Sequence, residues 1–134
     1  MLENRVPQTA RQTLLLMLLP MLATFAGLRL YLHLVHVQHI YPGGYLVHHL
    51  FIGILILVPG AFLLAFAPCR RPLQAVATAA VGIGSAMILD EFTYMIATKA
   101  TDQDYVSRVS LVGAIVCISL AVILLLILYA LHRD

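Results

Sequence analysis

The fold is decided by Leu111–Leu131, whose sequence LVGAIVCISLAVILLLILYAL contains no charged residue. A helix that crosses the hydrocarbon core of a bilayer needs about 20 predominantly apolar residues, and this stretch meets that requirement. Three further long apolar stretches precede it, separated from one another by short polar or turn-forming connections. We therefore expect four spanning helices, over about residues 12–37, 46–67, 73–98 and 107–131.

The composition of the whole chain supports a membrane protein. Of its 134 residues, 62% are apolar and 10% are charged, whereas a soluble domain carries roughly 25% charged residues. So few charges cannot cover a water-facing surface, and the length suits one domain. A net charge of +2 gives no reason to expect nucleic acid as a partner. The predicted fold class is all-α, a single-domain integral membrane four-helix bundle whose immediate partner is the lipid bilayer.

Short connections and basic residues predict the topology. With connections this short, consecutive helices are expected to pack as antiparallel neighbours, up-down-up-down. Basic residues flank the spans on one side, where the positive-inside rule places the cytoplasm; they are Arg5, Arg11, Arg70, Arg71 and Arg133. We therefore expect a multi-pass protein of the inner, cytoplasmic membrane with both termini in the cytoplasm. The first span is too long for a signal peptide alone and is expected to be retained.

Ionisable residues inside the spans are the candidates for function, since each costs a few kcal/mol at the membrane centre. At a rise of 1.5 Å per residue, Arg29 and Asp90 each lie about 24 Å from the cytoplasmic end of their helices. His33 and His48 lie at about 28 to 30 Å by the same count. Polar residues of three helices are therefore predicted to meet in one layer, in the outer third of the bilayer.

Helical periodicity points the same residues inward. Gly82, Ala86 and Asp90 recur at i, i+4 and i+8 on one face of the third span, and His49 shares a face with Gly53 on the second. Small residues let membrane helices approach closely, so both faces are expected to pack inside the bundle. Tyr31 and Tyr105 are expected in the aromatic belt at the membrane surface. The predicted pocket is lined by Arg29, His33, His36, His48, His49, Asp90, Glu91 and Tyr94, with Tyr105, Arg108 and Ser110 near its mouth.

Histidine and carboxylate side chains together suit Zn, Fe or Mn. The predicted ligands of a divalent transition metal are His33, His36, His48, His49 and Asp90. Glu91 and Arg108 are the predicted catalytic residues, with Glu91 outside the first shell as general base on metal-bound water. Because the pocket opens at the level of the lipid headgroups, the expected reaction is hydrolysis of a membrane-embedded substrate. The chain lacks an HExxH motif, so this prediction rests on composition and depth.

Three other interpretations remain open. In the first, Arg29 pairs with Asp90 or Glu91 for structural reasons. The chain is then a non-enzymatic membrane component that forms a homo-oligomer or joins a partner membrane subunit. In the second, facing histidines of the first two spans ligate a haem. In the third, the carboxylates and histidines carry protons for a transporter, although the apolar inner half offers no continuing path.

Three short strings resemble a pattern found in small, uncharacterised prokaryotic integral membrane proteins. The strings are HHLFIG at His48–Gly53, LDEF at Leu89–Phe92 and YVSRVS at Tyr105–Ser110. In this order, on the second, third and fourth spans, they match HHxxxG, LDEF and YxxRxS. The resemblance covers about residues 45 to 115 and carries no assigned mechanism. It implies that the residues that matter are His48, His49, Asp90, Glu91 and Arg108.

Overall fold

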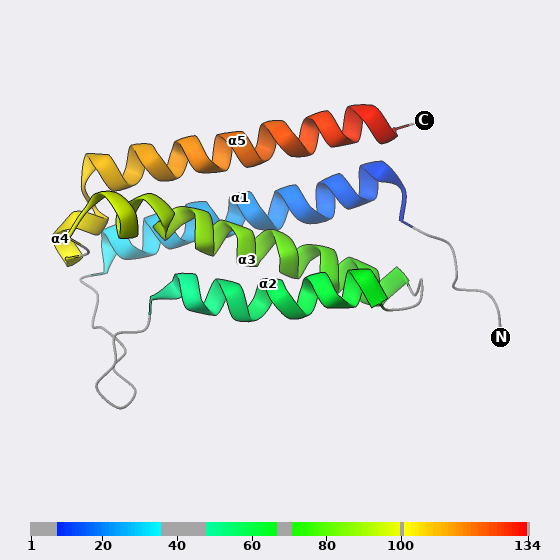
Figure 1. Ribbon diagram of the computed structural model, residues 1–134, viewed down its shortest axis with the longest axis horizontal. Helices are drawn as coiled ribbons and strands as arrows, with labels where there is room; N and C mark the ends of the chain where they lie inside the picture. The colour runs from blue at the N-terminus through cyan, green and yellow to red at the C-terminus, as the bar shows by residue number, and fades with distance from the viewer. Residues whose placement is uncertain (1–7, 36–47, 67–70, 100, 134) are drawn as a thin grey trace.

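A computed structural model of the chain describes residues 8–35, 48–66, 71–99 and 101–133. These residues form helices and no strand, which confirms the all-α fold class (Figure 1). Four of the helices are long and apolar enough to cross a membrane, as the sequence predicts. A short fifth helix, α4, was not predicted. The elements are α1 (Ala10–Leu34), α2 (His49–Phe66), α3 (Arg71–Ala97), α4 (Asp102–Tyr105) and α5 (Arg108–His132).

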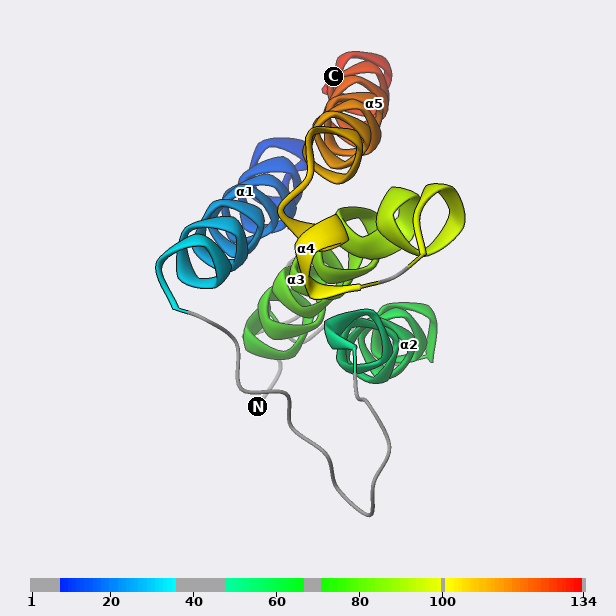
Figure 2. The ribbon, with the colours of Figure 1, turned by 90° about the vertical axis from the view of Figure 1, so that its left-hand side faces the viewer.

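Helix α3 lies at the centre of the molecule, where it packs against α1, α2 and α5 (Figure 2). Helices α1 and α5 also touch each other. Within the described residues, however, α1 and α2 make no close contact. The prediction that consecutive spans pack as neighbours is therefore wrong for the first two spans, because α3 lies between them.

Glycines on two faces of α3 explain its central position. A Cβ at Gly82 would collide with the backbone of Met17 in α1. A Cβ at Gly84 would lie 2.6 Å from the carbonyl oxygen of Gly53 in α2, far inside van der Waals contact. Since neither glycine has a side chain, α3 approaches the backbones of α1 and α2 at the same time. It therefore separates two helices that are adjacent in the chain.

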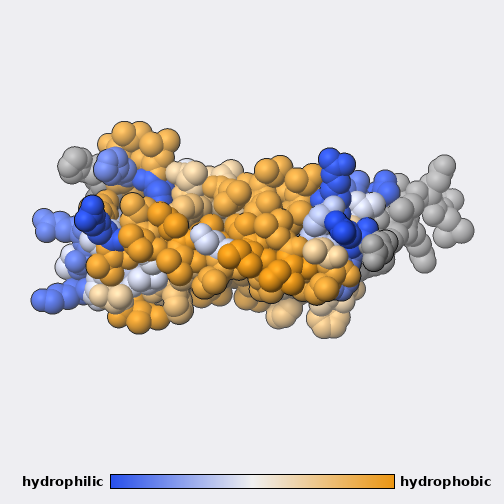
Figure 3. Space-filling view, turned by 90° about the horizontal axis from the view of Figure 1, so that it is seen from above, coloured by the Kyte–Doolittle hydropathy of each residue, from blue (hydrophilic) through white to orange (hydrophobic). Residues whose placement is uncertain are grey.

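The predicted inward face of α3 is confirmed. Gly82, Ala86 and Asp90 are all buried, and Ala86 packs with Met21 of α1 and Ile118 of α5 in the hydrophobic core. Large apolar side chains cover the outside of the long helices between polar ends, as Figure 3 shows for one face. This distribution is the reverse of that in a water-soluble helical bundle.

Side-chain caps hold the short helix α4 between α3 and α5. The amide of Asp104 donates to Thr101 Oγ1, and the Asp104 carboxylate accepts from the amide of Thr101, which together form a capping box. The hydroxyl of Ser107 accepts from the amide of Ser110 and caps α5 in the same way. Held by these caps, α4 places Tyr105 in a buried position. Its expected place in the aromatic belt is therefore wrong.

Candidate functional site

Arg29, near the end of α1, joins three other helices at one end of the molecule. Its Nε donates to Asp90 Oδ1 of α3 at 2.5 Å. Its Nη1 donates to the carbonyl of Tyr105 in α4 at 2.9 Å. Its Nη2 donates to the carbonyl of Asp90 at 3.1 Å and to Ser110 Oγ of α5 at 3.1 Å. One guanidinium group therefore holds α3, α4 and α5 against α1.

Asp90 is the fully buried partner of this guanidinium. Its Oδ2 accepts the hydroxyl proton of Tyr105 and lies 3.0 Å from His49 Nε2 of α2. The Tyr105 ring also packs against the charge of Arg29, whose Cζ lies 4.3 Å from the ring centroid, a favourable cation–π geometry. Burial and the neighbouring Asp90 carboxylate raise the pKa of Tyr105, so its phenol stays protonated and acts as a donor.

Glu91 points in a different direction from Asp90 and ties α3 to the beginning of α2. Its Oε2 accepts from the amide of Leu50 at 2.8 Å, which satisfies a backbone donor that the first turn of a helix leaves without an intrahelical partner. Its Oε1 lies 3.1 Å from His48 Nδ1 and 3.2 Å from His49 Nδ1. The structure thus places Glu91 in the seam between α2 and α3.

The ring of His49 lies between the two carboxylates, with Nε2 facing Asp90 and Nδ1 facing Glu91. A neutral imidazole carries only one N–H, so one of these contacts would set two lone pairs against each other. Both contacts are favourable when the three side chains share one additional proton.

Four of the predicted site residues therefore come together, namely His48, His49, Asp90 and Glu91. Tyr94 is buried beside them, with its ring centroid 5.9 Å from that of His48. The sequence did not assign Tyr105 or the Leu50 amide to the centre of the site. Both lie at helix ends, where helical periodicity gives no direction for a side chain.

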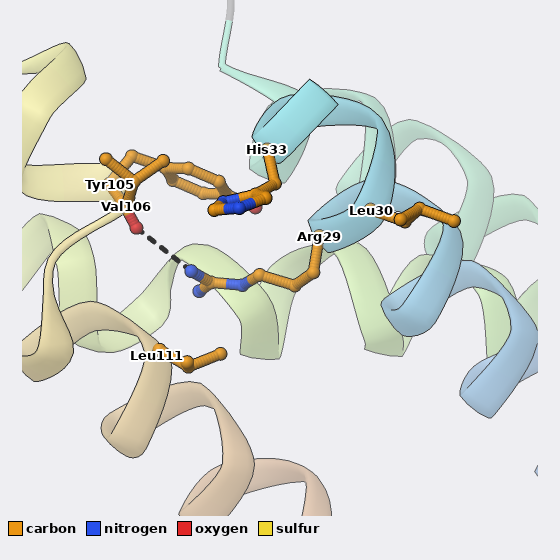
Figure 4. Close-up of a pocket in the computed structure, with 6 residues that line it drawn as sticks. All are labelled: Arg29, Leu30, His33, Tyr105, Val106 and Leu111. Carbon is orange, nitrogen blue, oxygen red and sulfur yellow. Dashed lines mark hydrogen bonds between the residues drawn. The ribbon is translucent and has the colours of Figure 1, made fainter. Parts of the chain in front are cut away.

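Two other predicted residues, His33 and Arg108, are exposed. His33 is exposed on α1 and lines a separate cavity with Arg29 and Tyr105 (Figure 4). Arg108 is exposed at the first position of α5. His36 lies outside the described residues. Among the residues that the structure describes, no three His, Cys, Asp or Glu side chains are arranged to hold a metal ion.

The chain matches no protein-family model, no curated protein and no solved structure. The three strings singled out in the sequence all contribute to one network: His48 and His49 come from the first, Asp90 and Glu91 from the second, and Tyr105 and Ser110 from the third. This convergence makes the network the candidate functional site.

Proposed function

We propose that the chain is a non-enzymatic membrane component, in which the polar network of Arg29, Asp90, Glu91, His48, His49 and Tyr105 fixes the register of the helices. The observation that carries the proposal is the set of hydrogen bonds from Arg29 to α3, α4 and α5. Every charged member of the network has a partner within the chain. Such pairing suits a structural role better than a site kept open for a substrate.

The energetics of membrane helices support this role. Apolar helices in lipid gain little free energy from one alignment over another, because lipid tails are as apolar as their side chains. A buried ion pair adds a strong preference for the one alignment of the helices in which the two charges meet. Separating the partners leaves an unpaired charge at a cost of about 3 to 5 kcal/mol. Sliding α1 along α3 by one turn would separate Arg29 from Asp90. The network therefore favours a single register.

The proposal places the chain in the inner, cytoplasmic membrane as an up-down-up-down protein with both termini in the cytoplasm. The ends of α1 and α3 that carry Arg29 and Asp90 meet the beginnings of α2 and α5, which supports alternating helix directions. Arg11, Arg71 and Arg133 lie at the opposite ends of these helices. By the positive-inside rule, that opposite end faces the cytoplasm. The partners would be lipid and a second membrane subunit or a second copy of the chain.

A double-mutant cycle tests the structural role. We expect Arg29→Gln and Asp90→Asn each to lower the free energy of unfolding by about 3 kcal/mol or more. The double variant should lose less than the sum of the two, because the residues act on each other directly. Unfolding is followed by circular dichroism in mild detergent. Arg11→Gln, at an exposed position on α1, serves as the control. Strictly additive losses, or losses equal to that of the control, would exclude the proposed role.

Metal binding is the second candidate, because His48, His49, Asp90 and Glu91 meet between α2 and α3. The contacts of His48 and His49 with Glu91 and of His49 with Asp90 are 3.0 to 3.2 Å long. The two nitrogens of His49 face different carboxylates, Nε2 toward Asp90 and Nδ1 toward Glu91, so these side chains would have to turn before they could share one ion. A bound metal would supply an activated water, and Glu91 or Arg108 would act on a membrane-embedded substrate.

Elemental analysis distinguishes the two candidates. Protein purified in mild detergent without chelator is assayed by mass spectrometry for Zn, Fe and Mn. The metal candidate requires near-stoichiometric metal in the wild type and its loss in both His48→Ala and Asp90→Ala. A folded wild type free of metal would exclude this candidate and leave the structural role.

A further inference from the structure

A cavity of about 340 Å³ lies beside the network, between α1, the turn after α4 and α5. Figure 4 shows the Arg29 side chain reaching from α1 toward Tyr105, with Leu111 of α5 on its other side. The lining combines one charged group, one imidazole and mostly apolar surface. The lining residues are Arg29, Leu30, His33, Tyr105, Val106 and Leu111.

The guanidinium of Arg29 keeps one donor for this cavity. An arginine side chain has five N–H groups. Nε uses its own on Asp90, Nη2 uses both of its groups on Asp90 and Ser110, and Nη1 uses one on the Tyr105 carbonyl. Within the described part of the chain, the second N–H of Nη1 has no acceptor. Since the side chain is 13% exposed and lines the cavity, this donor is accessible from it.

The surroundings of this donor indicate what the cavity accepts. Leu30, Val106 and Leu111 are exposed apolar side chains, and they lie where the long helices end. Arg108 lies three residues before Leu111, on the same side of α5. The carboxylate of Asp90 is fully buried and already paired with Arg29 and Tyr105, so it does not face the cavity as a free negative charge. The cavity therefore combines one cationic donor, Arg29, with an apolar wall.

We propose that this cavity binds an acidic phospholipid, with a phosphate oxygen accepting from Arg29 Nη1 and one acyl chain lying on Leu30, Val106 and Leu111. A phosphate oxygen satisfies a guanidinium donor better than a neutral acceptor does, because hydrogen bonds between charged groups are about twice as strong. His33, which also lines the cavity, offers a ring nitrogen as a second polar contact. The acyl chain follows from the exposed apolar wall, which a free phosphate ion would leave uncovered.

Native mass spectrometry of the full chain in mild detergent tests the proposal. The protein is titrated with phosphatidylglycerol, with phosphatidylcholine of the same acyl chains and with inorganic phosphate. We expect phosphatidylglycerol to bind about tenfold more tightly than phosphatidylcholine. Both lipids carry the phosphate, but the choline cation of phosphatidylcholine would lie near the Arg29 guanidinium and be repelled by it. Equal binding of the two lipids would overturn the proposal. Binding of inorganic phosphate as tight as that of phosphatidylglycerol would overturn the role of the acyl chain, and with it the proposal.

Two matched variants test whether this cavity is the lipid-binding site. Leu111→Trp fills the cavity and should abolish the preference for phosphatidylglycerol, whereas Leu128→Trp on the same helix should keep it. The two leucines are exposed to similar extents, 40% and 44%. Neither belongs to the polar network, so both variants should melt within a few degrees of the wild type whether or not the structural proposal holds. If Leu111→Trp is folded and retains the full lipid preference, the cavity is not the binding site.

Discussion

At the scale of single residues, the network is organised around the carboxylate of Asp90. This group receives Arg29 from α1, His49 from α2 and Tyr105 from α4, so each neighbouring element sends it one side chain. A buried carboxylate without such donors would cost several kcal/mol in a medium that offers no water. The three side chains together therefore offset the cost of burying Asp90.

The Tyr105 hydroxyl allows one contact of Asp90 to be removed without changing the shape of the core. Tyr105→Phe keeps the ring against Arg29 but removes a donor to the carboxylate. We expect the free energy of unfolding to fall by about 1 to 3 kcal/mol, the range for losing one hydrogen bond to a charged group. Tyr31→Phe, at a side chain that is 58% exposed, should change it by less than about 0.5 kcal/mol. Thermal unfolding in detergent measures both, and equal effects would show that the hydroxyl contributes nothing.

The residue scale also shows what the sequence can predict. Counting the rise along each helix brings Arg29, His48 and Asp90 to one depth, since depth and phase follow directly from position in a helix. The same count places His33 on the face of Arg29, but only the longer arginine side chain reaches the interior. Tyr105 follows a turn, where no period applies, and its buried position depends on the caps of α4.

At the scale of helices, small residues on α3 decide the arrangement. The sequence identifies the face that carries Gly82, but Gly84 lies about 160° away from it around α3. Each glycine meets a different helix, α1 in one case and α2 in the other. Loop length alone suggested that α1 and α2 are neighbours. The two-sided packing of α3 overrides that suggestion, because close backbone contact is the main gain available to helices in lipid.

A substitution at Gly84 tests this arrangement. Gly84→Val should separate α2 from α3, since its Cβ would lie 2.6 Å from the Gly53 carbonyl oxygen. We expect a loss of about 3 kcal/mol or more, together with poor recovery of folded protein. Gly27→Ala is the control, because a Cβ there meets nothing within 4 Å; it should be neutral or slightly stabilising. If the valine variant unfolds at the wild-type temperature, the close approach of α2 and α3 is wrong.

At the scale of the whole molecule, an apolar belt separates two polar ends (Figure 3). The end that carries α4 includes Lys99 and Arg108 with the acidic residue Asp104, whereas Arg11, Arg71 and Arg133 lie at the other. A soluble monomer rarely exposes a contiguous apolar surface larger than a few hundred Å². A belt around all four long helices therefore calls for lipid, and the excess of arginine at one end predicts which end stays in the cytoplasm.

Cysteine labelling tests both parts of this conclusion. In a chain with Cys69 and Cys117 replaced by serine, Gln103→Cys marks the α4 end and His132→Cys marks the other. We expect a membrane-impermeant maleimide to label Gln103→Cys in intact bacterial cells and His132→Cys only after the membrane is opened. Because the two positions lie at opposite ends of the long helices, only a chain that crosses the bilayer separates them in this way. The reverse labelling pattern would mean that the orientation is inverted and that the Arg29–Asp90 network lies on the cytoplasmic side. Labelling of both cysteine variants in intact cells would exclude a chain that spans the membrane.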